Sequence, residues 1–76
     1  IGADRMKYRI LFKDKIDKEI LRTVKNKHCH ELEGLESLYD FLIEDGVCDS
    51  QKPALIYYLA YTLALENIEI IIVRLD

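Results

Sequence analysis

The sequence predicts an α/β fold class: a small two-stranded parallel sheet packed by three helices, in the order strand–helix–helix–helix–strand. Three observations predict it. Apolar residues alternate with charged ones over residues 6–12, they recur every three or four residues over 31–46, and an unbroken apolar run lies at 70–73. These patterns are typical of a half-buried strand, an amphipathic helix and a strand buried on both faces, respectively.

The length suits one domain, because 76 residues lie near the lower limit for a chain that folds alone. We therefore expect a single domain over 1–76. Met6 is a candidate native start, in which case residues 1–5 lie outside the native protein. Half of the residues are hydrophobic, which is rich for so small a body and indicates self-association.

The first strand is expected to bury one face, and the helix after it to pack on that face. Asp14 and Asp17 suit the start of this helix, which continues to about residue 27. The inward strand residues are Met6, Tyr8, Ile10 and Phe12, and the inward helix residues are Ile16, Ile20, Leu21 and Val24.

The second helix, over 31–46, is the most clearly amphipathic segment of the chain. Gly46 is expected to end it in the left-handed conformation. Its apolar stripe consists of Leu32, Leu35, Leu38, Tyr39, Leu42 and Ile43, and its outer face carries Glu33, Glu36, Asp40 and Glu44. The helix therefore predicts a row of carboxylates in solvent.

The third helix, over 54–65, is apolar on nearly every side and is expected to be covered all round. Asp49 or Ser50 is expected to cap it, with Pro53 in its first turn. Because the apolar run continues, a helix is favoured over the alternative of a strand at 53–58.

The last strand, over 68–75, follows a tight exit at Glu66 and Asn67 and is expected to lie parallel to the first. A two-stranded sheet leaves unpaired edges, and this strand carries little charge to protect its edge. We therefore expect a homodimer, or a partner that adds to the sheet. The assembly candidates are Tyr57, Tyr58, Tyr61, Ile70 and Ile72.

The net charge of −3 hides an asymmetry between the two parts of the chain. Residues 1–30 hold nine Lys or Arg and four Asp or Glu, whereas 31–76 hold two and ten. Such a split predicts either two surfaces of opposite sign or two parts that face and neutralise each other. Both interpretations stay open.

Candidate metal and redox residues are few. Zinc needs four convergent ligands, and His28, Cys29 and His30 are separated from Cys48 by a helix of about 22 Å. We expect no metal and no cofactor. The two cysteines form one bridge only if the fold brings them together, and a reduced, cytoplasmic chain is expected.

Other function classes are disfavoured by missing motifs. No nucleophile with a base partner and no Gly-rich phosphate loop is recognisable, so we expect no enzyme. The acidic balance disfavours nucleic acid as the main partner, and the apolar run over 53–65 is too short to span a bilayer. The basic residues that would have to follow a phosphate backbone are Lys7, Arg9, Lys15, Lys18, Arg22 and Lys25.

Residues 34–42, Gly-Leu-Glu-Ser-Leu-Tyr-Asp-Phe-Leu, are similar to the second helix of barstar-type ribonuclease inhibitors. Residues 66–73 resemble the closing turn and strand of that family, whose middle strand has no counterpart among the predicted elements. The resemblance implies an inhibitor whose acidic helix plugs the basic site of a secreted ribonuclease. It assigns Glu36 and Asp40 to the acidic positions that face the enzyme, and Tyr39 to the aromatic residue between them.

The leading hypothesis is a small acidic-faced protein-binding module, such as an inhibitor or immunity protein that plugs a basic, nuclease-like site. The alternative is a homodimeric assembly module that acts through the tyrosine-rich helix and the last strand. The partner-binding candidates are Glu33, Glu36, Tyr39, Asp40 and Glu44, and no catalytic residue is predicted.

Overall fold

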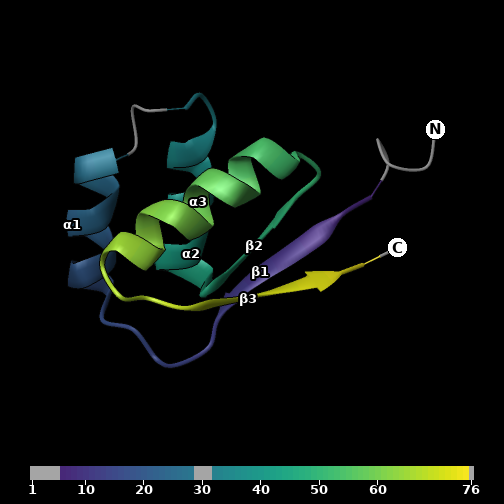
Figure 1. The fold of residues 1–76 in the computed structure, drawn as a ribbon. Helices are drawn as coiled ribbons and strands as arrows, with labels where there is room; N and C mark the ends of the chain where they lie inside the picture. Colours follow the sequence, from purple (N-terminus) through teal and green to yellow (C-terminus); the bar gives the residue numbers. More distant parts are fainter. Residues whose placement is uncertain (1–5, 29–31, 76) are drawn as a thin grey trace.

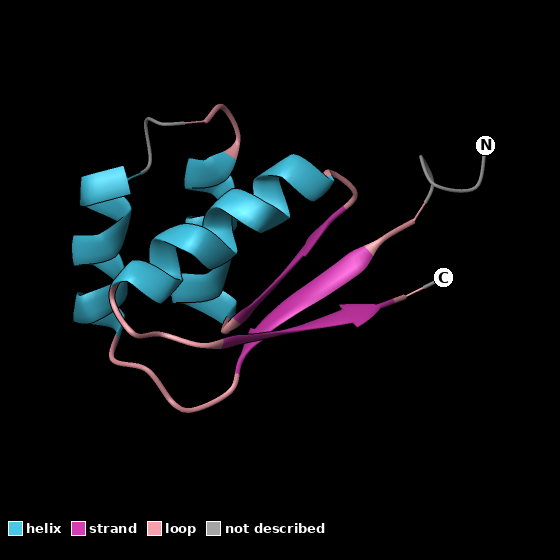
Figure 2. Ribbon diagram, viewed as in Figure 1, coloured by secondary structure: helices cyan, strands magenta, loops and turns pink. Residues whose placement is uncertain are grey.

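The computed structural model describes residues 6–28 and 32–75, which form three helices and one three-stranded sheet (Figures 1 and 2). Figure 1 shows the helices packed together on one side of the sheet. In chain order the elements are β1 (Tyr8–Phe12), α1 (Lys18–His28), α2 (Leu35–Asp45), β2 (Val47–Ser50), α3 (Pro53–Leu65) and β3 (Ile70–Arg74).

The prediction of a two-stranded parallel sheet is wrong. The sheet has three strands in the order β2-β1-β3, and β1 is antiparallel to both of its neighbours. Ile10 lies between Cys48 of β2 and Ile72 of β3 in this register. The two outer strands therefore run in the same direction, with β1 inserted between them.

The strand directions follow from the number of helices in each connection. Two helices, α1 and α2, separate β1 from β2, so the chain returns to the end of the sheet where β1 finished, and β2 must run back (Figure 1). A single helix, α3, then carries the chain across once more, so β3 runs parallel to β2. The prediction overlooked β2 and thus one reversal of the chain.

The segment after Gly46 is a strand, so the expectation that it enters the third helix directly is wrong. Asp49 and Ser50 belong to β2 and do not cap α3. The N-cap of α3 is Lys52, whose backbone N–H donates to Ser50 Oγ at 3.1 Å. Four residues are too few for a recognisable alternation, and Asp is a poor strand former, which explains the error.

The amphipathic helix and its stop are confirmed as α2. Gly46 has a φ of 76°, and its N–H donates to the carbonyl of Leu42 at 3.0 Å. A side chain disfavours this left-handed conformation, which is why glycine ends the helix there. The predicted start at residue 31 is wrong, because residues 32–34 form a turn and the helix begins at Leu35, with Gly34 as its N-cap at a φ of 92°. The buried residues of α2 are Leu35, Leu38, Tyr39, Leu42 and Ile43.

The core lies between the helices and the side of the sheet that faces them. Ile10, Leu35, Leu59 and Leu63 are completely buried there. In α1, Leu21 and Val24 point inward as predicted, whereas the inward placement of Ile20 is wrong, because that residue is 50% exposed.

The predicted complete burial of the last helix and the last strand is wrong. Pro53 is the first residue of α3, as expected, but this helix is covered on one side only and exposes Tyr57, Tyr61 and Leu65. β3 is an edge strand and not a buried parallel one. The unbroken apolar run of β3 is typical of a strand buried on both faces, but β3 lies at an edge of the sheet and exposes Ile71, Ile72 and Val73.

Candidate interaction surfaces

The acidic face consists of Glu33, Glu36, Asp40 and Glu44, and all four side chains are exposed. α2 carries the last three at intervals of four residues, so they share one side of the helix. The side chain of Glu36 is 65% exposed and that of Asp40 is 53% exposed. The structure thus brings these predicted site residues together in solvent.

Lys25 of α1 partly neutralises this acidic face. Its Nζ lies 2.5 Å from Asp40 Oδ1 and 3.8 Å from Glu36 Oε1. Similar ion pairs join Lys13 to Glu69 and Lys27 to Glu66. The basic and acidic parts of the chain therefore face each other at several points, which is one of the two arrangements that the charge asymmetry allowed.

Tyr39, the aromatic candidate of the acidic helix, points into the core and is fully buried. Its hydroxyl is hydrogen-bonded to Thr62 Oγ1 of α3. Because Thr62 donates its single hydroxyl proton to the carbonyl of Leu59 at 3.0 Å, Tyr39 is the donor to Thr62. A partner that docks on the acidic face does not touch Tyr39 in this conformation.

Phe41 is the exposed aromatic residue of α2, and the sequence analysis did not single it out. It is 55% exposed and lies in a shallow hollow of about 520 Å³ together with Ser37, Asp40, Glu44 and Asp45. The sequence pattern that could have identified this residue is a phenylalanine at a helix position outside the inward apolar stripe. Phe41 places an apolar group among the carboxylates of the acidic face.

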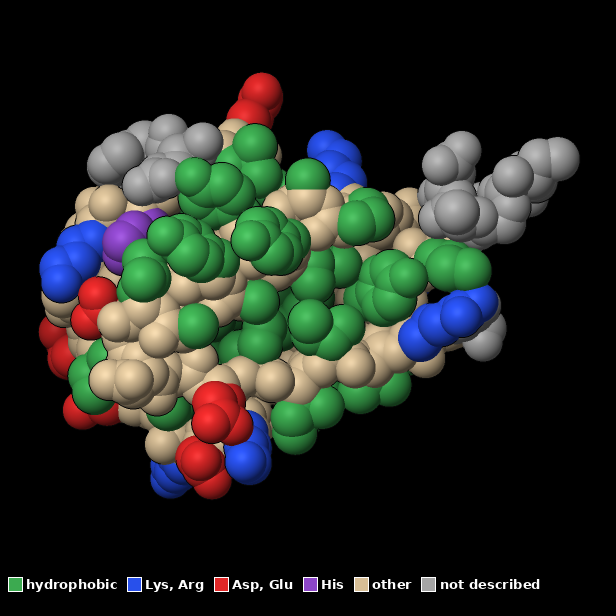
Figure 3. Space-filling view, viewed as in Figure 1, with side chains coloured by type: hydrophobic (Ala, Val, Ile, Leu, Met, Phe, Trp, Pro, Cys, Tyr) green, Lys and Arg blue, Asp and Glu red, His purple; other side chains and the backbone are tan. Residues whose placement is uncertain are grey.

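A tyrosine cluster covers the exposed side of α3. Tyr57 is 70% exposed and stacks on Tyr61 with ring centroids 6.5 Å apart, while the half-buried Tyr58 meets Tyr61 edge-on at 6.1 Å. In Figure 3 hydrophobic side chains are spread widely over the face of the molecule that carries α3. The three tyrosines thus form one surface, with Tyr58 at its buried margin.

An apolar groove separates this cluster from β3. The hollow of about 200 Å³ at one end is lined by Tyr8, Pro53, Ile56, Tyr57 and Ile72. A second hollow of about 530 Å³ continues along α3 and is bounded by Ile70 and Ile72, with the polar residues Asn67 and Glu69 at its other end. Three assembly candidates, Tyr57, Ile70 and Ile72, therefore line the groove, and Ile72 borders both hollows, whereas Tyr58 and Tyr61 line neither.

The groove opens onto the free edge of the sheet. In the part of the chain that the structure describes, no strand pairs with the outer side of β3. Ile71, Ile72 and Val73 are 42%, 45% and 42% exposed, and Leu75 follows at 39%. The open edge, the groove and the tyrosine cluster adjoin one another at Ile72 and Tyr57 and are together called the β3 surface below.

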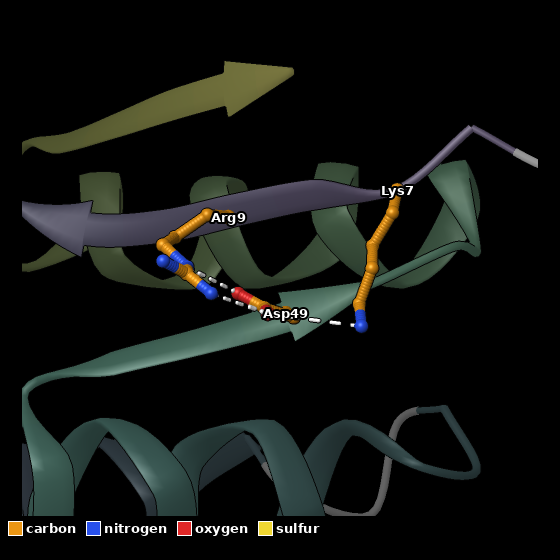
Figure 4. Close-up of polar contacts among 3 residues, drawn as sticks. All are labelled: Lys7, Arg9 and Asp49. Carbon is orange, nitrogen blue, oxygen red and sulfur yellow. Dashed lines mark hydrogen bonds and ion pairs between the residues drawn. The ribbon is translucent and has the colours of Figure 1, made fainter. Parts of the chain in front are cut away.

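The far side of the sheet carries an ion cluster at its β2 edge (Figure 4). Arg9 donates from Nε and Nη2 to the two oxygens of Asp49 at 2.8 and 3.0 Å, and Lys7 Nζ lies 3.9 Å from the same carboxylate. The hydrogen bond from Arg9 is the main cause that lowers the pKa of Asp49, and partial desolvation opposes it. Because Arg9 and Asp49 are cross-strand neighbours, the cluster fixes β2 against β1.

Nucleophile and metal chemistry find no support among the described residues. Burial raises the pKa of the Cys48 thiol to about 12, so this thiol is neutral at pH 7. Cys29 and His30 lie outside the described residues, so the conditional bridge between Cys29 and Cys48 stays untested. Within residues 6–28 and 32–75, no group of three or more His, Cys, Asp or Glu side chains is placed to hold a metal ion.

None of the helices in the described ranges has both the length and the apolar character needed to cross a bilayer. In comparisons with known proteins, no protein-family model, no curated protein and no solved structure matches this chain. The barstar-type resemblance therefore stays a prediction. The acidic face and the β3 surface are the two features of the described residues that bear on function.

Proposed function

We propose that this protein is an assembly module that associates with a second copy of itself through the β3 surface. The observation that carries the proposal is the open edge of β3, at which Ile71, Ile72 and Val73 each expose at least 42% of their surface. The alternative function considered from the sequence thus becomes the leading one.

Edge strands of monomeric proteins are usually protected by charges, bulges, prolines or a covering segment. β3 has no charged residue and no proline between Ile70 and Val73. Contiguous exposed apolar area of this kind is typical of an interaction surface. Tyrosine supports the proposal as well, because it combines a large apolar area with a polar tip and is enriched at interfaces.

A second copy is favoured as the occupant because a small chain gains most from it. A domain of 76 residues buries only about 60% of the surface of its unfolded chain, which leaves it marginally stable. Self-association adds burial for this apolar region without requiring a further gene product. A symmetric pair is also the commonest oligomer of soluble proteins.

The test is sedimentation equilibrium over micromolar to submillimolar protein. We expect a dimer that persists in high salt, because the contact is apolar. Ile72→Lys is expected to give a monomer, since it places a charge at the centre of the groove. Ile20→Lys is the matched control, because Ile20 has a similar exposure of 50% but lies on α1. Circular dichroism of both variants checks that they remain folded.

A wild-type monomer at every concentration would contradict the proposal. So would an equal loss of association in both variants, which would indicate a general effect of charge. If Ile72→Lys fails to fold, Ile72→Thr replaces it, because threonine keeps the β-branched shape that suits a strand.

The acidic face supports a second candidate function, binding of a basic protein. The specific observation is that Phe41 is 55% exposed among outward-facing carboxylates, a combination of an apolar anchor with complementary charge. The resemblance to barstar-type inhibitors points to the same helix. A partner would compete with Lys25 for Glu36 and Asp40.

This second candidate is tested with a secreted basic ribonuclease of the kind that barstar-type proteins inhibit. We expect inhibition of RNA cleavage that weakens with salt and with Asp40→Ala, and that strengthens with Lys25→Ala. Asp14→Ala is the control, because Asp14 is exposed but lies before α1. Inhibition that is equal at low and high salt would rule out the electrostatic mechanism.

A further inference from the structure

We infer that β3 pairs antiparallel with β3 of a second copy, which extends the sheet to six strands. The two-fold axis lies midway between the two Ile72 residues and is called the axis through Ile72 below. The inference rests on the self-association proposed above and adds its geometry.

The hydrogen bonds of β3 with β1 show which backbone groups are already used. Lys13 N–H donates to the carbonyl of Glu69 at 3.2 Å, and Leu75 N–H donates to the carbonyl of Lys7 at 2.8 Å. In an antiparallel ladder the bonded positions alternate, so Ile71 and Val73 also bond to β1. The N–H and carbonyl groups of Ile70 and Ile72 consequently face the open edge.

The symmetry limits how two such edges can meet. A two-fold axis perpendicular to the sheet keeps the groove-facing residues of both copies on the same face, so it must lie midway between the two copies of one β3 residue. An axis through Ile72 overlaps the whole five-residue strand with its copy. An axis through Ile71 or Val73 offsets the strands by two residues and shortens the ladder.

The axis through Ile72 also joins the edge-facing groups correctly. Each Ile72 N–H then donates to the Ile72 carbonyl of the other copy, which is the doubly bonded pair of an antiparallel ladder. Ile71 lies opposite Val73 on the outer face, and Glu69 lies opposite Leu75. No two like charges face each other across the junction, so nothing in the strand opposes this register.

The side chains on the helix side explain why the groove is apolar. Ile72 lines the hollow formed with Tyr8, Pro53, Ile56 and Tyr57. With the axis through Ile72, the two Ile72 side chains meet and each copy extends the groove wall of the other. A parallel pairing about an axis along the strand would place the helices of the two copies on opposite sides and leave both grooves open.

Strand pairing alone would be a small contact. A stable interface buries about 800 Å² per partner, more than a five-residue strand provides. The tyrosine cluster beside the groove supplies the further area, since Tyr57 is 70% exposed next to Ile72. The inferred dimer therefore uses β3 and α3 together.

Disulfide cross-linking of the full chain tests the register. Single cysteines replace Ile71, Ile72 or Val73 in a Cys29→Ser background, and the buried Cys48 is common to all variants. Across the axis the Ile72 Cα atoms are about 5.5 Å apart, within disulfide range, whereas the two Ile71 Cα atoms are about 9 Å apart. We expect oxidation to give a covalent dimer with Ile72→Cys alone, and with a mixture of Ile71→Cys and Val73→Cys.

Ile71→Cys alone and Val73→Cys alone are expected to stay uncross-linked. If either of them cross-links and Ile72→Cys does not, the register is wrong. If sedimentation shows a dimer that none of the variants traps, the β3 pairing is wrong while self-association stands. If the wild type is a monomer in sedimentation, the proposed function fails together with this inference.

Discussion

Tyr39 joins α2 to α3 at the centre of the core. It is completely buried, and its hydroxyl donates to Thr62, which in turn donates to the carbonyl of Leu59. The ring fills the space between the two helices, while the hydroxyl chain fixes their relative position. Buried polar groups that are satisfied in this way favour one arrangement of a core.

Tyr39→Phe is expected to lower the free energy of unfolding by about 1 kcal/mol, the usual net contribution of one buried hydrogen bond. Urea denaturation at a fixed protein concentration measures the change. Tyr57→Phe is the matched control and is expected to change stability by less than about 0.5 kcal/mol, because its ring is 70% exposed. Equal losses in the two variants would contradict the assigned role of the Tyr39–Thr62 bond.

The Asp49 cluster gives stability a pH dependence with a definite sign. Because Arg9 lowers the pKa of Asp49 in the folded protein, the ionised carboxylate stabilises the fold above its unfolded pKa of about 4. This contribution is lost as the pH falls through the lower, folded value.

Asp49→Asn is therefore expected to be less stable than the wild type at pH 7, with a difference that shrinks on acidification below pH of about 4. Urea midpoints between pH 7 and 2 measure it. Arg9→Gln removes the guanidinium that lowers the pKa of Asp49, so it should abolish the same part of the pH dependence. A difference that does not vary with pH would show that Asp49 acts through packing instead of charge.

At the scale of elements, α2 shows how far the sequence alone predicts this protein. Its leucines, its carboxylates and Gly46 predicted the buried stripe, the exposed face and the stop, because local periodicity determines all three. The contact of Lys25 with Asp40 was not predictable, since it depends on how α1 packs beside α2. Local patterns do not contain such tertiary contacts.

β2 and β3 show where the same approach fails. β2 is too short for its pattern to emerge, and it forms only because β1 supplies a neighbour for Asp49 and Cys48. β3 has the composition of a central strand but lies at an edge. Whether a strand is central depends on the whole sheet, so the exposure of Ile72 became visible only in the fold.

The tyrosine cluster of α3 is expected to contribute to association more than to stability. Tyr57→Ser should weaken the dimer about tenfold or more, as expected for an aromatic residue near the centre of an interface, and leave the thermal unfolding of the monomer nearly unchanged. Phe41→Ser is the control, because Phe41 is 55% exposed on α2. Sedimentation velocity compares the two variants. An equal effect of both would remove α3 from the interface.

At the scale of the whole molecule, one missed strand changed the topology. The first strand, the three helices and the last strand follow one another along the chain as predicted. The additional strand β2 reverses the chain once more and makes the sheet antiparallel. The charge asymmetry of the sequence is also resolved only here, where basic residues of the first part meet carboxylates of the second. The β3 surface, by contrast, exposes mainly apolar side chains.

Hydrogen exchange of single β3 amides, followed by NMR at low and high protein concentration, tests the central claim most directly. The Ile71 amide bonds to β1 in every state, whereas the Ile72 amide faces the open edge and gains a partner only in the dimer. We predict that protection of the Ile72 amide rises with concentration while that of Ile71 changes little. Rapid exchange of the Ile72 amide at all concentrations would contradict self-association through β3.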